Sequence, residues 1–220
     1  MTLGVLGGTF DPIHLGHVAA AIAAERTLKL RSVALIPSRL PPHRPEQARV
    51  SPLHRLAMTT LAAANHPSWS VSDVELKRDG PSYTFDTLTE LAGQGHRASQ
   101  IFFIIGADAF AEIATWSRYP AVLDLAHFAV VARPGITLDS LKKRVPDLAD
   151  RMTTPESFKP QVTSSPSDKT RVILIEAATP DISSTEIRRR LGAGESIAGL
   201  VPDFVATYLA HHRLYVEAGL

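Results

Sequence analysis

The chain has 220 residues, 45% of them hydrophobic, and its 23 basic and 22 acidic side chains leave a formal net charge of +1. This near-balance creates no global field toward nucleic acid or a membrane surface, so we expect neither as a partner, and any anion must bind locally. The absence of Cys excludes disulfides and a thiol nucleophile. No apolar run approaches the roughly 18 residues of a membrane span, and the start shows no signal-peptide pattern. We therefore expect a soluble cytoplasmic protein.

The first predicted elements are a strand and a helix joined by a glycine-containing turn. Residues 3–6 are an apolar run that predicts a buried strand, and residues 15–27 are alanine-rich and predict an amphipathic helix. Backbone N–H groups at such a helix start favour anions. Gly7 and Gly8 permit positive φ and a close ligand, and Gly16 leaves room for a nucleotide. We expect phosphate to bind at this turn.

Two histidines lie at the same turn, in the stretch GGTFDPIHLGH of residues 7–17. His14 and His17 are three apart, so we expect them on one face of the helix. A His-x-x-His pair is about as often a surface or core pair as a functional one, and a metal site is a weaker alternative because zinc normally takes a third protein ligand. The spacing fits neither the dinucleotide fingerprint nor a P-loop.

Further strands are expected at residues 33–36, 70–76, 101–105, 128–132 and 172–176, with helices between them, including one over residues 52–64. The strand at 70–76 alternates polar and apolar residues, which favours a strand with one wet face. Residues 139–171 are polar and proline-punctuated and predict one short helix and a mobile loop. Six strands alternating with helices predict a Rossmann-like, doubly wound, mostly parallel sheet with helices on both faces, in a single α/β domain spanning residues 1–220.

Several polar or aromatic residues follow predicted strands, where open α/β sheets bind ligands. The loop at residues 37–45 contains Arg39, His43 and Arg44, although a stiff polyproline connector would explain its prolines. Asp108 follows the strand at 101–105 and is either a ligand contact or the N-cap of a helix starting near residue 109. Trp116, at the end of that helix, is either core or a stacking surface.

Two further segments predict helix starts. In residues 81–87, Ser82 or Thr84 can cap the helix. In residues 182–190, Ser183 and Glu186 form a capping box, but hydroxyls at a helix N-terminus with Arg188 one turn later also make a phosphate clamp. Arg189 and Arg190 are expected to be solvated surface residues.

Residues 7–17 resemble the His-x-Gly-His signature of the nucleotidyltransferase superfamily. With the further motifs, the chain looks like the bacterial nicotinate-mononucleotide adenylyltransferases. The match is weakest at residues 139–171. Related enzymes that act on phosphopantetheine share the first and last motifs but lack the middle ones, Pro-Ser-Tyr-Thr and Thr-Trp. The motifs are Pro41-Pro42-His43-Arg44, Pro81-Ser82-Tyr83-Thr84, Gly106-x-Asp108, Thr115-Trp116, Arg133-Pro134-Gly135 and Ile182-Ser183-Ser184-Thr185-x-Ile187-Arg188.

The resemblance implies a Rossmann-like enzyme of NAD biosynthesis that joins ATP to nicotinate mononucleotide by direct in-line displacement, giving deamido-NAD and pyrophosphate. It implies Mg²⁺ held chiefly by the ATP phosphates, with no side-chain ligands. Alternatives are nicotinamide mononucleotide or phosphopantetheine as acceptor, or an inactive nucleotide-sensing regulator. The oligomeric state stays open, with a homo-oligomer as one alternative.

The resemblance also assigns roles to individual residues. His17 and His14 would be catalytic and would contact ATP. Asp108 would accept from a ribose hydroxyl, and His43 and Arg44 would meet phosphate. The remaining ATP-binding residues would be Gly8, Thr9, Phe10, Ile182, Ser183, Ser184, Thr185 and Arg188, and the mononucleotide-binding residues would be Tyr83, Thr84, Asp108, Trp116, Arg133, His43 and Arg44.

Overall fold

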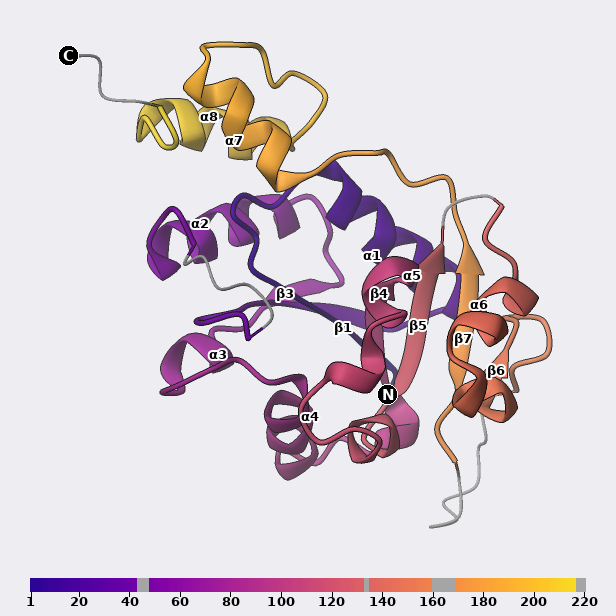
Figure 1. Cartoon of the computed structure of the whole chain (residues 1–220). Helices are drawn as coiled ribbons and strands as arrows, with labels where there is room; N and C mark the ends of the chain where they lie inside the picture. Colours follow the sequence, from indigo (N-terminus) through magenta and orange to yellow (C-terminus); the bar gives the residue numbers. More distant parts are fainter. Residues whose placement is uncertain (43–47, 133–134, 160–168, 217–220) are drawn as a thin grey trace. The chain divides into compact units, whose positions relative to one another are not determined.

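The computed structural model describes residues 1–42, 48–132, 135–159 and 169–216 (Figure 1). Within these residues, strands form a seven-stranded sheet in the order β3-β2-β1-β4-β5-β7-β6. The central order 3-2-1-4-5 is that of a doubly wound sheet, in which ligands bind at the carboxyl ends of strands where the order reverses, here at β1 and β4. The predicted Rossmann-like α/β class is confirmed. The strands are β1 (Leu3–Gly8), β2 (Ser32–Pro37), β3 (Trp69–Val71), β4 (Ile101–Gly106), β5 (His127–Ala132), β6 (Met152–Thr153) and β7 (Val172–Glu176).

The residue contacts divide the chain into two compact units. The first unit contains Met1–Gly7, Ala20–Ala34 and Tyr83–Thr179, and the second contains Gly8–Ala19, Leu35–Ser82 and the residues from Pro180 onward. The interpretation of residues 1–220 as one domain therefore stays a prediction. Across the ranges that the structure describes, no helix has both the length and the apolar composition to cross a membrane.

The first unit is built on parallel strand pairs. β4 pairs with β1 and β5, and β7 pairs with β5 and β6, all in parallel (Figure 1). β4 and β5 are buried along almost their whole length because continuous apolar runs suit strands covered on both faces. The helical elements of this unit are α4 (Thr84–Gly93), α5 (Ala107–Phe110), α6 (Leu138–Arg144), η1 (Ala98–Gln100), η2 (Ile113–Thr115), η3 (Ala121–Asp124) and η4 (Pro146–Arg151).

The second unit contains the start of α1 (Leu15–Leu28), and α2 (Pro52–Ala63), α3 (Val74–Lys77), α7 (Ser184–Gly192) and α8 (Asp203–His211). α2 starts where its sequence directs, because Ser51 accepts a hydrogen bond from the His54 backbone N–H and Pro52 occupies the first turn. The predicted helix boundaries at residues 15 and 52 are thus confirmed.

The predicted strand over residues 70–76 is wrong in its second half. β3 ends at Val71, and Val74 opens the short helix α3 instead. Its turn is closed by a hydrogen bond from the Lys77 backbone N–H to the Asp73 carbonyl and by an ion pair between the same two side chains at 2.9 Å. Val74 and Glu75 are both buried although they are adjacent, so the alternation did not correspond to two faces of a sheet.

The segment at residues 139–171 contains more structure than predicted. The single short helix is present as α6, but η4 and the strand β6 follow it, and β6 pairs with β7. The expected total of six strands is therefore one too few. A two-residue strand is too short to produce a periodic signal in the sequence. The mobile loop predicted within this segment stays a prediction, and residues 160–168 lie outside the described residues.

Candidate active site

The two motif histidines lie against each other in the second unit. His14 immediately precedes α1 and His17 belongs to its first turn, and their rings stack with centroids 3.7 Å apart. The His14 backbone N–H donates to His17 Nδ1 at 3.3 Å. Because Nδ1 accepts, the neutral His17 ring carries its proton on Nε2, which makes Nε2 a hydrogen-bond donor.

His14 is the more enclosed histidine, with only 6% of its surface exposed. Burial lowers the pKa of His14 from 6.5 to about 4, so its ring is neutral at physiological pH. Its Nδ1 is buried and has no hydrogen-bond partner among the residues that the structure describes. His14 therefore contributes a neutral, packed ring beneath His17 rather than a positive charge.

The motif glycines make room for side chains of the motif itself. A Cβ on Gly16 would lie 2.9 Å from His14 Nδ1, and one on Gly8 would lie 2.8 Å from the Phe10 ring. The positive φ that was expected at Gly7 and Gly8 is found at Phe10 instead, at 50°. The Phe10 ring is 1% exposed and meets the His17 ring edge-on at 5.1 Å. The prediction that Gly16 leaves room for a nucleotide stays a prediction.

Asp11 joins this turn to three other parts of the second unit. Its side chain is buried, Oδ1 accepts from the Tyr215 hydroxyl at 2.6 Å, and Oδ2 accepts from the Arg49 backbone N–H at 2.9 Å. Arg188 donates to the Asp11 carbonyl at 2.7 Å and lies 3.6 Å from Oδ2. Asp11 was expected only to fix a turn, but it is the residue on which these segments converge.

The N-terminus of α7 packs directly on the same turn. Ser183 is the N-cap, as predicted, and accepts from the Glu186 backbone N–H at 3.2 Å. Ser184 Oγ donates to the Pro12 carbonyl at 2.9 Å, and Arg188 contacts Thr185 Oγ1 at 3.2 Å. The hydroxyls and guanidinium expected to bind phosphate are thus held against the turn and against one another.

The second half of the predicted capping box is absent. The Glu186 carboxylate forms ion pairs with Arg189 at 2.8 Å and Arg190 at 2.9 Å. These hydrogen bonds, from Arg189 first, lower the pKa of Glu186 to about 2. Arg189 and Arg190 are therefore paired surface residues rather than simply solvated ones.

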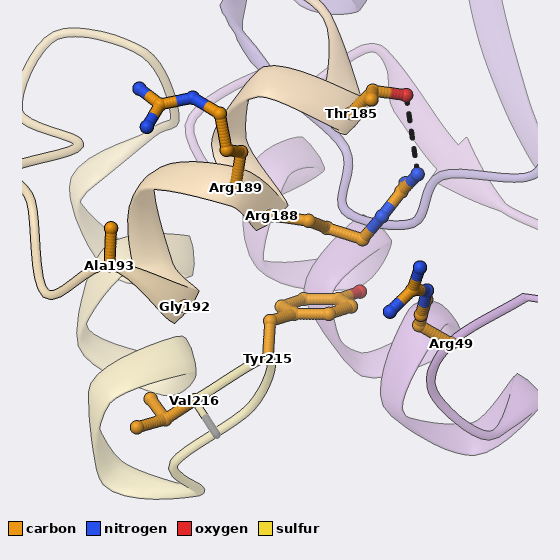
Figure 2. Close-up of a pocket in the computed structure, with 8 residues that line it drawn as sticks. All are labelled: Arg49, Thr185, Arg188, Arg189, Gly192, Ala193, Tyr215 and Val216. Atoms are coloured by element: carbon orange, nitrogen blue, oxygen red, sulfur yellow. Dashed lines mark hydrogen bonds between the residues drawn. The ribbon is translucent and has the colours of Figure 1, made fainter.

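A basic cavity of about 690 Å³ lies beside this cluster (Figure 2). Figure 2 shows Arg188 extending toward Thr185, with the Arg49 guanidinium near the Tyr215 hydroxyl, while Arg189 points away. Among the residues that the structure describes, no Asp or Glu lines it, so this lining carries net positive charge suited to a polyphosphate. The lining residues are Arg49, Thr185, Arg188, Arg189, Gly192, Ala193, Tyr215 and Val216.

Arg55 on α2 supports the turn from within the second unit and was not singled out from the sequence. It is 1% exposed, and its guanidinium donates to the carbonyls of Thr9 at 2.7 Å and Ser38 at 2.6 Å. Burial lowers the pKa of Arg55, although the nearby Asp11 carboxylate opposes the shift. The sequence could have indicated this role, because Arg55 lies on the buried face of α2. Arginine is rare at buried positions unless its charge is paired.

The residues predicted to bind the mononucleotide belong to the first unit where they are described. Tyr83 precedes α4 as its N-cap and Thr84 is its first residue, but no side chain caps this helix, so the capping interpretation was wrong. Ser82, in the second unit, accepts from the Arg39 backbone N–H at 2.9 Å instead. The N-cap residue of α4, Tyr83, makes no side-chain capping hydrogen bond.

Asp108 and Trp116 follow β4 in the first unit, as expected. Gly106, not Asp108, is the N-cap of α5, so the capping alternative for Asp108 was wrong. Asp108 is exposed and lies 3.5 Å from Arg144. The helix ends at Phe110, well before Trp116, which is half-buried and meets Phe103 edge-on at 5.9 Å.

Three predicted residues, His43, Arg44 and Arg133, lie outside the described residues. Ile182 lies just before α7, and its N–H donates to the Pro180 carbonyl. Where side chains are placed, no cluster of three or more His, Cys, Asp or Glu is positioned to hold a metal ion.

The fold and the cavity beside a two-histidine turn define a nucleotidyltransferase. In agreement, the sequence model of the cytidylyltransferase-like family matches residues 5–190. A probable nicotinate-nucleotide adenylyltransferase of Roseiflexus sp. (strain RS-1) is 40% identical, with 97% of each chain covered. A protein of the same description from Citrifermentans bemidjiense is also 40% identical, with 99% of this chain and 100% of the relative covered.

A solved structure of the nicotinic acid mononucleotide adenylyltransferase of Plasmodium falciparum, complexed with APC, has the same fold. Its TM-score is 0.71 at 18% identity, covering 97% of this chain and 96% of the other. From the near full-length relatives, the chain belongs to the nicotinate-nucleotide adenylyltransferase family.

Proposed function

We propose that this enzyme transfers the adenylyl group of ATP to nicotinate mononucleotide, giving deamido-NAD and pyrophosphate. The observation that carries the proposal is the direct bonding of two distant motifs in the second unit. Ser184 and Arg188 of α7 bond the Pro12 and Asp11 carbonyls of the histidine turn, next to a basic cavity. The relatives named for this reaction share the chain over nearly its full length.

The side chains fit an in-line displacement at the α-phosphorus of ATP. The phosphate monoester of the acceptor is largely dianionic near pH 7, since its second pKa is about 6, and it attacks without a general base. Negative charge then grows on the transferring group and on the departing pyrophosphate. His17 is proposed to donate from Nε2 to the transferring group, and Arg188 is proposed to neutralise charge on the leaving side.

His14 is proposed to position His17 rather than to titrate. Its buried neutral ring stacks on the His17 ring, and its backbone N–H fixes the His17 tautomer. A protonated His14 would place a charge in an enclosed site and would be costly. The pair therefore presents one donor of defined orientation toward the phosphates.

The family and its ATP substrate imply a divalent metal ion, and we propose Mg²⁺. The triphosphate offers the hard oxygen ligands that Mg²⁺ prefers, and Mg²⁺ commonly keeps several waters. When bound it would neutralise phosphate charge. The cationic lining of the cavity, with Arg49 and Arg188, would supplement that neutralisation from the protein side.

We propose that the first unit holds the acceptor. The start of α4 at Thr84 has no side-chain cap, so its first backbone N–H groups and the positive end of the helix dipole are suited to the nicotinate carboxylate. Trp116 is half-buried and held edge-on by Phe103, which is compatible with one face stacking on the pyridinium ring. Asp108 is proposed to accept from a ribose hydroxyl.

Product analysis tests the proposal. The purified enzyme is incubated with ATP, Mg²⁺ and, separately, nicotinate mononucleotide, nicotinamide mononucleotide or phosphopantetheine, and products are identified by mass with parallel pyrophosphate release. Deamido-NAD and equimolar pyrophosphate with the first acceptor are expected. A preference for another acceptor would reassign the substrate, and no product with any of them would favour a nucleotide-sensing role.

A further inference from the structure

Tyr215, in the segment after α8, makes a contact that the reaction described above does not use. Its hydroxyl donates to Asp11 Oδ1 at 2.6 Å, and its backbone has a φ of 61°, in the left-handed region that non-glycine residues seldom adopt. Burial, followed by the hydrogen bond to Asp11, raises the pKa of Tyr215, so the hydroxyl stays protonated and remains a donor. A conformation of this kind persists only where surrounding contacts impose it.

The Asp11 carboxylate is a negative charge beside a cavity suited to phosphates. Tyr215 occupies Oδ1 and the Arg49 backbone N–H occupies Oδ2. Arg188, which lines the cavity, forms an ion pair with Oδ2 at 3.6 Å, beyond hydrogen-bond distance, and donates a hydrogen bond to the Asp11 carbonyl. The carboxylate is thus held at ion-pair distance from the arginine, without a direct hydrogen bond to it.

We propose that Tyr215 is a positioning residue for ATP binding: it fixes the Asp11 carboxylate so that the Arg188 guanidinium stays available to the triphosphate. This inference rests on the proposed adenylyl transfer for the identity of the ligand. Without the hydroxyl, Oδ1 loses its partner, and the carboxylate rotates from ion-pair distance to a direct hydrogen bond with Arg188. ATP must then compete with an internal anion for the same guanidinium.

Deleting one hydroxyl tests this. Calorimetry with ATP and Mg²⁺, in the absence of any acceptor, should show Tyr215→Phe binding about tenfold more weakly than the unmodified enzyme, the size of one charge-assisted hydrogen bond. The Kd for nicotinate mononucleotide should stay within about twofold, because the Tyr215 hydroxyl bonds Asp11, which is not among the residues proposed to hold the acceptor.

Tyr208→Phe is the matched control. Tyr208 is also a tyrosine whose hydroxyl bonds a side chain, His54 Nδ1 at 2.9 Å, but it does not line the cavity. Its variant should bind ATP as the unmodified enzyme does. Equal ATP affinity in Tyr215→Phe, or equal weakening in both tyrosine variants, would overturn the inference, as would parallel weakening of both substrates.

A second measurement separates positioning from general support. In an Asp11→Asn background no carboxylate is left to capture Arg188, so adding Tyr215→Phe should change the ATP Kd by less than about threefold. A full, additive loss in the double variant would show that Tyr215 acts by another route. Because binding is measured without turnover, failure of adenylyl transfer in the unmodified enzyme would refute the proposed function and still leave the role of Tyr215 decided.

Discussion

Replacing Arg55 by Met should destabilise the second unit, and the structure sets the magnitude. The guanidinium makes two short bonds, to the carbonyls of Thr9 and Ser38, and a longer one of 3.4 Å to that of Arg39. Two charge-assisted hydrogen bonds contribute about 3 to 6 kcal/mol together. Removing the charge also relieves its desolvation cost, which offsets roughly half of that sum. We expect a net loss of about 2 kcal/mol in the free energy of unfolding.

Urea unfolding measures that loss, and calorimetry should show the melting temperature falling by about 4 to 8 °C for a chain of this size. Arg55→Lys keeps the charge but lacks the planar guanidinium, so its free energy of unfolding should lie between those of Arg55→Met and the unmodified protein. The control is Arg26→Met, an exposed arginine on α1 whose replacement should stay within about 0.5 kcal/mol. A loss below about 1 kcal/mol in Arg55→Met would refute the reasoning that the buried guanidinium holds the turn.

Three further predictions concern the acceptor residues and the two buried histidines. Trp116→Ala should raise the KM for nicotinate mononucleotide, because it removes a stacking interaction of about 0.5 to 2 kcal/mol, and should leave the KM for ATP nearly unchanged. If both KM values rise and the melting temperature falls, Trp116 serves only in core packing. The acid should exceed the amide mononucleotide about tenfold or more in kcat/KM, because backbone donors at α4 suit a carboxylate; equal values would place the carboxylate elsewhere. Burial lowers the pKa values of His14 and His127 from 6.5 to about 4, so the unfolded chain binds more protons below pH 6.5. Stability is therefore full above pH 6.5 and should drop by about 2 kcal/mol per histidine between pH 7.5 and 5. Urea unfolding at both pH values checks this. In His127→Gln the change in the free energy of unfolding between the two pH values should be about half as large. A free energy of unfolding that does not depend on pH would contradict the prediction.

The strands that could be predicted are those whose sequence alone determines their burial. The runs in β4, β5 and β7 are continuously apolar, and only a strand covered on both faces accommodates them. β6 is two residues long and exists because β7 offers it a parallel partner. The strand predicted beyond Val71 does not form, because Asp73 and Lys77 bond to each other and close a helical turn there.

The residues of the candidate site also divide into those that the sequence predicted and those that it did not. The histidine turn and Ser183 were visible because each is a local arrangement of cap, glycine and helix start. Tyr215 and Arg55 could not be predicted from the sequence, because each acts on a group far away in the chain. Tyr215 bonds the Asp11 carboxylate, and Arg55 bonds backbone carbonyls such as that of Thr9. The close approach of the His14 ring to Gly16 was likewise not visible, because it depends on how the turn folds.

The kcat of His17→Ala tests the central claim most directly, that the two-histidine turn performs adenylyl transfer. The His17 donor should act mainly as charge develops on the transferring group, so its loss should lower kcat by about 10² to 10³ while the ATP Kd changes little. The control is His66→Ala, in which the lost histidine stacks on Trp69 at 3.9 Å and lies outside the proposed site. A His17→Ala enzyme with a kcat within a few-fold of the unmodified enzyme would contradict the account.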